Sequence, residues 1–167
     1  SKIYCFPGNA GTSMIAQNVN LDPDNFSELE RYCLEKKIEM LVVGPEKPLV
    51  NGVVNHFKDK PIKVFGPDKI SSKLEGSKIF TKKICKKKNI PTSKFKICEN
   101  LNETIDFLKS SYFPLVIKAD GLASGKGVYI CKDFYEAKIA SEEIFNGKFG
   151  IAEKILVEEF LDGEEMS

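Results

Sequence analysis

The fold is decided by one stretch, VIKADGLASGKGVYI, at residues 116–130. Its pattern predicts a β-strand, a glycine-rich loop and a second β-strand. Glycines let backbone N–H groups turn toward an anion without side-chain obstruction, and two lysines add positive charge. A Walker A loop is excluded, because Gly121 precedes Gly125 by one residue too few and Gly127 stands where Ser or Thr would bind magnesium. The stretch therefore predicts a loop that lies over phosphate groups.

Two other motifs favour a nucleotide site over a plain β-hairpin with a mobile glycine turn, the alternative for the loop alone. Upstream, LEGSK at residues 74–78 ends in a lysine. Downstream, VEEFL at residues 157–161 is an extended segment that can offer backbone groups to an adenine edge. The three together predict a cleft for a nucleotide.

The first ninety residues alternate short β-branched runs with helical patterns, which is typical of a parallel sheet with crossover helices. Strands are expected at residues 2–6, 39–43 and 62–65, and each ends at a glycine-containing turn. Helices are expected from Asn25 to about residue 37 and over residues 49–57. Open sheets of this type bind ligands at the carboxyl ends of their strands.

A lysine-rich helix at residues 76–89 ends before Pro91, because the residue preceding a proline is disfavoured in the α region. Beyond it, strands are expected at residues 95–98, 115–118, 128–131 and 155–160. Helices are expected at residues 102–110 and from Asp133, which caps with Glu136, to Gly147.

The fold class is thus α/β: a partial Rossmann-like parallel-sheet domain followed by a small α+β subdomain. The predicted domains are residues 1–90, residues 91–158, and residues 159–167 as the start of a further subdomain.

Composition narrows the functional classes. The chain has 167 residues, and 25 Lys and Arg nearly balance 24 Asp and Glu. The formal net charge of +1 is too small to attract the chain to nucleic acid or to an anionic membrane. Its five cysteines are odd in number and lack a Cys-x-x-Cys pair, which favours a reducing cytosol over a disulfide framework or zinc site. No apolar run approaches the roughly 18 residues that span a bilayer.

A family resemblance covers essentially the whole chain. Motifs in matching order and spacing are PGNAGT (7–12), GPEKPLV (44–50), FGP (65–67), LEGSK (74–78), IPT (90–92), KADGLASGKGV (118–128) and residues 157–165. This set resembles phosphoribosylamine–glycine ligase of purine biosynthesis, a member of the ATP-grasp superfamily.

The resemblance implies ATP-dependent joining of glycine to 5-phosphoribosylamine, which gives glycinamide ribonucleotide, ADP and phosphate through a glycyl phosphate. ATP and Mg²⁺ or Mn²⁺ are the implied cofactors, and both substrates are small molecules. A cytoplasmic enzyme is implied, while the oligomeric state stays open. Such chemistry depends mainly on positioning and charge neutralisation, so no acid or base residue is assigned.

Site residues follow from the same resemblance. The implied ATP-binding residues are Lys78, Lys118, Ala123, Ser124, Gly125, Lys126, Gly127, Val128, Glu158, Glu159, Phe160, Leu161 and Glu165. Lys78 and Lys118 would neutralise the phosphates. The implied phosphoribosylamine side comprises Gly8, Asn9, Gly44, Pro45 and Glu46.

Simpler interpretations stand beside these roles. Lys78 is alternatively one more solvated lysine, and Glu46 alternatively caps the helix that follows it. Only one of Glu158 and Glu159 need face a nucleotide, and His56 is assigned a structural role. Five further lysines, Lys82, Lys83, Lys86, Lys87 and Lys88, are assigned to solvent.

The chain departs from the family at both ends. Family members begin with a further strand and a Gly-Gly-Arg-Glu-His turn, and they continue into a region with the Mg²⁺ ligands and the glycine site. We therefore expect no metal ligands within these 167 residues and no activity from them alone; turnover by the isolated chain would contradict this. The alternatives are another ATP-grasp ligase or carboxylase, a non-catalytic nucleotide-binding module, and a dinucleotide-binding domain.

Overall fold

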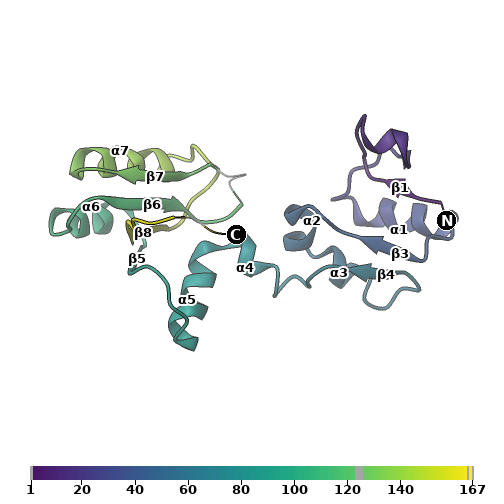
Figure 1. The fold of residues 1–167 in the computed structure, drawn as a ribbon, viewed down its shortest axis with the longest axis horizontal. Helices are drawn as coiled ribbons and strands as arrows, with labels where there is room; N and C mark the ends of the chain where they lie inside the picture. The colour runs from purple at the N-terminus through teal and green to yellow at the C-terminus, as the bar shows by residue number, and fades with distance from the viewer. Residues whose placement is uncertain (1, 123–125, 165, 167) are drawn as a thin grey trace. The chain divides into compact units, whose positions relative to one another are not determined.

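A computed structural model describes residues 2–122, 126–164 and 166 of the chain. It consists of two compact units, Ser1–Lys73 and Leu74–Ser167 (Figure 1). The division falls before the predicted boundary at residue 90. The reason is that the lysine-rich helix hydrogen-bonds to the second unit, whereas Pro91 marks only the end of that helix.

The first unit contains two pairs of parallel strands, as the alternating pattern predicts. Strand β1 (Tyr4–Cys5) pairs with β2 (Gln17–Asn18), and β3 (Met40–Val42) pairs with β4 (Lys63–Phe65). The other elements are the short helix η1 (Thr12–Met14), α1 (Phe26–Glu35), α2 (Glu46–Asn51) and α3 (Val53–His56).

Helix α1 begins as its sequence predicts. The Asn25 side chain accepts a hydrogen bond from the Glu28 backbone N–H at 3.3 Å, which satisfies one of the unpaired donors of the first turn. Leu29 and Cys33 then face the core. The single helix expected at residues 49–57 is wrong: Gly52, with φ of 98°, adopts a left-handed conformation and separates α2 from α3.

The second unit is built around a four-stranded antiparallel sheet with the strand order β5-β8-β6-β7. Its strands are β5 (Phe95–Cys98), β6 (Leu115–Ala119), β7 (Val128–Cys131) and β8 (Ile155–Glu159). Its helices are α4 (Lys73–Gly76), α5 (Lys78–Lys88), α6 (Leu101–Lys109) and α7 (Phe134–Phe145).

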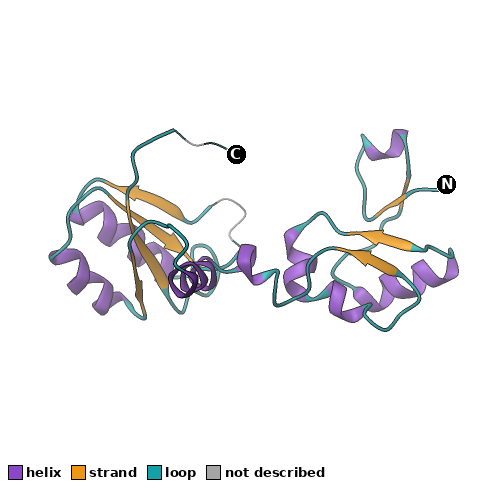
Figure 2. Ribbon diagram, turned by 60° about the horizontal axis from the view of Figure 1, so that its bottom comes forward, coloured by secondary structure: helices purple, strands orange, loops and turns teal. Residues whose placement is uncertain are grey.

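The two faces of this sheet have different neighbours. Helices α6 and α7 cover one face and enclose a core in which Ile117, Ile144 and Ile155 are fully buried (Figure 2). Helix α5 lies against part of the other face, because its Lys82 ammonium sits over the Phe95 ring and contacts Glu158. On the rest of that face, Val128 and Ile130 of β7 are exposed.

All five cysteines are free thiols. Cys33, Cys98 and Cys131 are buried, and burial raises the pKa of each thiol, to about 11 for Cys131. Among the helices that the structure describes, none is long and apolar enough to cross a membrane.

Candidate functional site

Strands β6 and β8 place a lysine and a glutamate on the same face of the second sheet. Side chains alternate along a strand, so Lys118 and Glu158 point away from the core that holds Ile117 and Val157. The Lys118 Nζ lies 3.0 Å from Glu158 Oε2, and the Glu158 residue is only 5% exposed. The predicted phosphate-binding lysine is thus held beside the sheet by an acidic neighbour.

Glu158 is held in its charged form. Burial raises the pKa of its carboxyl, but the hydrogen bonds from Ser93 and Lys118 and the positive charges of Lys118 and Lys82 outweigh burial. Its pKa is therefore lowered overall. A buried carboxylate of this kind requires cationic or hydrogen-bonding partners at all times.

The beginning of the glycine loop is fixed to helix α5. The Asp120 carboxylate accepts hydrogen bonds from Ser77 Oγ, at 2.9 Å to one oxygen and 3.1 Å to the other, and from the Ile79 N–H at 3.1 Å. An anion at this end of a helix is favoured by the unpaired N–H groups and the helix dipole. Lys78, the first residue of α5, donates from its Nζ to the Gly121 carbonyl at 3.1 Å. Lys78 therefore lies at the beginning of the loop.

The base of the loop is closed by a hydrogen bond across its two ends. The Ala119 N–H donates to the Gly127 carbonyl at 2.8 Å, so the chain returns beside the strand from which it left. Lys126 and Gly127 precede β7, which begins at Val128. The predicted site residues Ala123, Ser124, Gly125 and Glu165 lie outside the described residues.

The two glutamates of the predicted adenine segment have different surroundings. Glu158 faces Lys118, whereas the Glu159 carboxylate accepts a hydrogen bond from the Lys94 N–H at 2.7 Å. Phe160 and Leu161 follow β8 and are 37% and 65% exposed. Of the acidic pair, Glu158 is therefore the one directed toward the candidate nucleotide site.

Sequence reasoning missed two residues of this cluster. Asp120 was given no role, although it anchors the loop to α5. Lys82 was assigned to solvent, and this is wrong: it is 9% exposed and donates to Ser93 Oγ and Thr92 Oγ1, each at 2.6 Å. The useful signal was the spacing from Ile79, because residues three apart lie on one helix face. Lys83, Lys86, Lys87 and Lys88 are exposed, as predicted.

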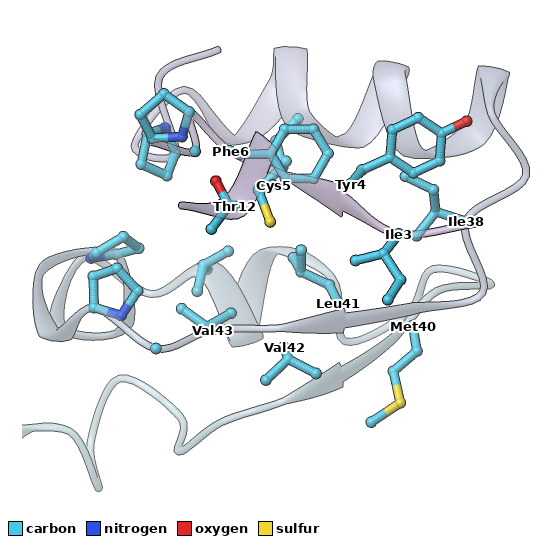
Figure 3. A pocket seen from close by; sticks show the side chains of 18 of the residues that line it. Ile3, Tyr4, Cys5, Phe6, Thr12, Ile38, Met40, Leu41, Val42 and Val43 are labelled. Atoms are coloured by element: carbon cyan, nitrogen blue, oxygen red, sulfur yellow. The ribbon is translucent and has the colours of Figure 1, made fainter. Parts of the chain in front are cut away.

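The first unit has a pocket of about 750 Å³ whose walls are strands β1 and β3 and the segments after them. Figure 3 shows Ile3 and Cys5 directed toward Leu41 and Val43 across it. Four of the residues predicted to bind phosphoribosylamine lie together in its lining: Gly8, Asn9, Gly44 and Pro45. Glu46 is instead the first residue of α2 and is not part of the lining.

Hydrogen bonds hold the turn that leads away from β1. The Asn9 N–H donates to Thr12 Oγ1 at 2.7 Å, and the Thr12 N–H donates to Asn9 Oδ1 at 3.0 Å. Thr12 Oγ1 in turn donates to Asn18 Oδ1 at 2.7 Å. Gly8, with φ of 80°, leaves no room for a side chain, since a Cβ there would lie 2.2 Å from Asn18 Oδ1. The turn thus presents backbone, rather than a side chain, at residue 8.

Two lysines near a glycine loop between antiparallel strands, with an acidic residue on the adjacent strand, are the arrangement expected of an ATP-grasp domain. Two family models match the chain: the phosphoribosylglycinamide synthetase N domain over residues 1–75 and the ATP-grasp (A) domain of the same enzyme over residues 76–167. The chain belongs to the phosphoribosylglycinamide synthetase family.

Individual relatives agree with this assignment. The chain is 45% identical, over 99% of its length, to a phosphoribosylamine–glycine ligase of Caldanaerobacter subterraneus subsp. tengcongensis, and it spans 40% of that relative. It is also similar to the crystal structure of phosphoribosylamine–glycine ligase from Thermotoga maritima, with a TM-score of 0.75 and 31% identity, over 98% of this chain and 39% of that one.

A more distant neighbour shares the fold alone. The biotin carboxylase domain of Hydrogenobacter thermophilus 2-oxoglutarate carboxylase, in complex with MgADP, ADP and bicarbonate, has a TM-score of 0.71 at 20% identity. The match covers 96% of this chain and 39% of that one. The ATP-grasp fold implied by the family resemblance is confirmed by the family model and by the Thermotoga maritima structure.

Proposed function

We propose that this chain supplies much of the ATP site, and one wall of the phosphoribosylamine site, of a phosphoribosylamine–glycine ligase. The reaction joins glycine to 5-phosphoribosylamine at the expense of ATP and gives glycinamide ribonucleotide, ADP and phosphate. The observation that carries the proposal is the position of Lys118, on the open face of the second sheet at the base of the glycine loop. Family membership supports the choice of substrates.

Within this proposal, the lysines neutralise charge rather than exchange protons. Lys78 at the start of α5 contacts the loop at Gly121, and Lys118 lies on β6, the strand that leads into the loop. A triphosphate covered by the loop would lie near both lysines. Cations fixed in this way stabilise the negative charge that develops during transfer of a phosphoryl group to the glycine carboxylate. Glu158, Phe160 and Leu161 would line the adenine, and exposed Val128 on β7 would extend that apolar surface.

Magnesium needs oxygen ligands that the described part of this chain does not gather. No three His, Cys, Asp or Glu side chains within it lie together as a metal site. When bound, Mg²⁺ would supply positive charge that offsets part of the charge of the triphosphate. The steps assigned to this chain are therefore positioning and charge neutralisation.

The end of the pocket that follows β1 and β3, at Gly8, Asn9, Gly44 and Pro45, is proposed to take the phosphoribosylamine. Asn9 is fixed by its hydrogen bonds to Thr12, and Gly8 and Asn9 line the pocket directly after β1. Gly44 and Pro45 follow β3 on the opposite wall, at a carboxyl strand end, where ligands of open parallel sheets bind. The free thiols favour a reducing, cytosolic setting.

The test is ADP formation by the full-length enzyme with Mg-ATP, omitting glycine or phosphoribosylamine in turn, alongside Lys118→Ala. We expect turnover that requires both substrates and falls by at least about a hundredfold in the variant, the scale of losing a preorganised charge-stabilising group. Lys94→Ala, which removes a lysine whose side chain is 92% exposed, is the matched control. ATP binding without substrate-dependent ADP would leave the fold intact and refute the assigned reaction.

A further inference from the structure

Among the described residues, the buried cluster at the candidate ATP site contains more positive than negative charge. A single carboxylate, Glu158, lies between two ammonium groups: Lys118 Nζ at 3.0 Å and Lys82 Nζ at 3.2 Å, both measured to Oε2. Ser93 Oγ donates to the same oxygen at 2.7 Å. Two cations for one anion leave a surplus positive charge beside the sheet.

The surplus positive charge is important because Lys118 would have two different partners. It holds Glu158 in the structure described here, and it would contact phosphate when ATP is bound. If Lys118 were the only cation near Glu158, its movement to a phosphate would leave a buried carboxylate without a counter-ion. Breaking a buried pair in this way is strongly unfavourable. Nucleotide binding would then compete with the cluster itself.

Lys82 is placed to prevent that competition. Its side chain is 11% exposed, and its Nζ is held by Ser93 Oγ and Thr92 Oγ1, over the Phe95 ring. Lys118, by contrast, contacts only Glu158 among the described side chains, and its own side chain is 25% exposed. One cation is fixed, and the other is free to turn toward the open face.

We propose that Lys82 is a positioning residue for ATP binding: it remains as the permanent counter-ion of Glu158, so that Lys118 can transfer to the nucleotide phosphates. This role rests on the proposed ATP-dependent function. It predicts that the charge of Lys82 affects ATP affinity through Glu158, although Lys82 itself does not contact ATP.

The experiment measures ATP binding and the KM for ATP in the full-length enzyme. Lys82→Gln removes the charge but keeps a hydrogen-bond donor for Ser93 and Thr92. We expect ATP to bind roughly tenfold or more weakly, the scale of one hydrogen bond to a charged group, with a smaller change in kcat. Lys83→Gln, exposed on the same helix, is the control and should bind ATP like the wild type.

A double-mutant cycle separates this role from a structural one. In a Glu158→Gln background no buried carboxylate needs a counter-ion. There, Lys82→Gln should change ATP affinity by no more than about twofold, which is the usual deviation from additivity for two sites that do not interact. An equal penalty in both backgrounds would show that Lys82 merely attaches α5 to residues 92–93, and no penalty in either would also overturn the proposal.

The roles of Lys82 and Lys118 can also be tested in the wild-type enzyme, so this test does not depend on whether a variant folds. Amine acetylation followed by mass spectrometry should find Lys82 protected with and without ATP, while Lys118 becomes protected only when ATP is added. Reactivity of Lys82 that appears on ATP binding would contradict a fixed counter-ion. Wild-type ADP formation that depends on both substrates tests the proposed function separately from these readouts.

Discussion

Replacing Asp120 by alanine should loosen the contact between the glycine loop and helix α5. The Asp120 carboxylate accepts from Ser77 Oγ and from the Ile79 N–H, and it faces the positive end of the helix dipole. Hydrogen bonds to charged groups contribute about 1.5–3 kcal/mol, and an anion at a helix N-terminus about 0.3–1 kcal/mol. Because Asp120 is only partly buried, we take about 2 kcal/mol as the local cost.

Amide hydrogen exchange measures this cost where it arises, without requiring the whole chain to unfold in one step. A loss of about 2 kcal/mol corresponds to roughly thirtyfold faster exchange, at 1.36 kcal/mol for each factor of ten, in residues 78–81. Asp106→Ala is the matched control, because Asp106 forms only an exposed ion pair with Lys109. If Asp120→Ala exchanged no faster at these positions than Asp106→Ala, the anchoring role assigned to Asp120 would be refuted.

Three further outcomes are expected. Gly8→Ala should lower the free energy of unfolding by about 1–3 kcal/mol, because its Cβ meets the Asn18 side chain in a left-handed conformation; Gly44→Ala, whose Cβ would have no neighbour within 4 Å, is the control for urea denaturation. Ile117→Ala should cost about 2–5 kcal/mol in the same assay, since it leaves a cavity in a fully buried position, and a cost below 1 kcal/mol would contradict the packing described. The lowered pKa of Glu158 contributes stability above its ordinary value of 4.5, and this contribution is lost as pH falls through the lower folded-state pKa. The melting temperature should therefore decline less between pH 5 and about 3 in Glu158→Gln than in the wild type. Parallel curves of melting temperature against pH would contradict the stabilising role of the Glu158 carboxylate.

Local signals in the sequence predicted most of the elements. The capping pair at Asn25 and Glu28 marks the beginning of α1, and Asp133 with Glu136 does the same for α7. These interactions lie within four residues, so the sequence determines them directly. The parallel pairing in the first unit also follows from the alternation of strands and helices.

Long-range arrangements could not be predicted in the same way. Strand β8 enters between β5 and β6, a pairing that no periodicity within β8 encodes. The two-residue strand β2 has no pattern of its own and exists because its backbone pairs with β1.

The candidate site shows the same limit. Motifs identified Lys78 and Lys118, but Lys82 stands in a lysine run whose composition indicates solvent exposure. Its burial depends on Ser93 and Glu158, which are 11 and 76 residues away in the sequence. The burial of Lys82 could not be predicted from its neighbours in the sequence, because its partners come close only when the sheet has folded.

The distribution of thiols gives each unit its own chemical reporter. Thiolates are the reactive form, so the raised pKa of buried Cys33, Cys98 and Cys131 makes these three inert toward alkylating reagents at neutral pH. The partly buried thiols remain, with Cys5 in the pocket wall of the first unit and Cys85 on helix α5 of the second. In a Cys85→Ser chain, the alkylation rate of Cys5 thus reports on whether that pocket is filled, with no label added to the ligand.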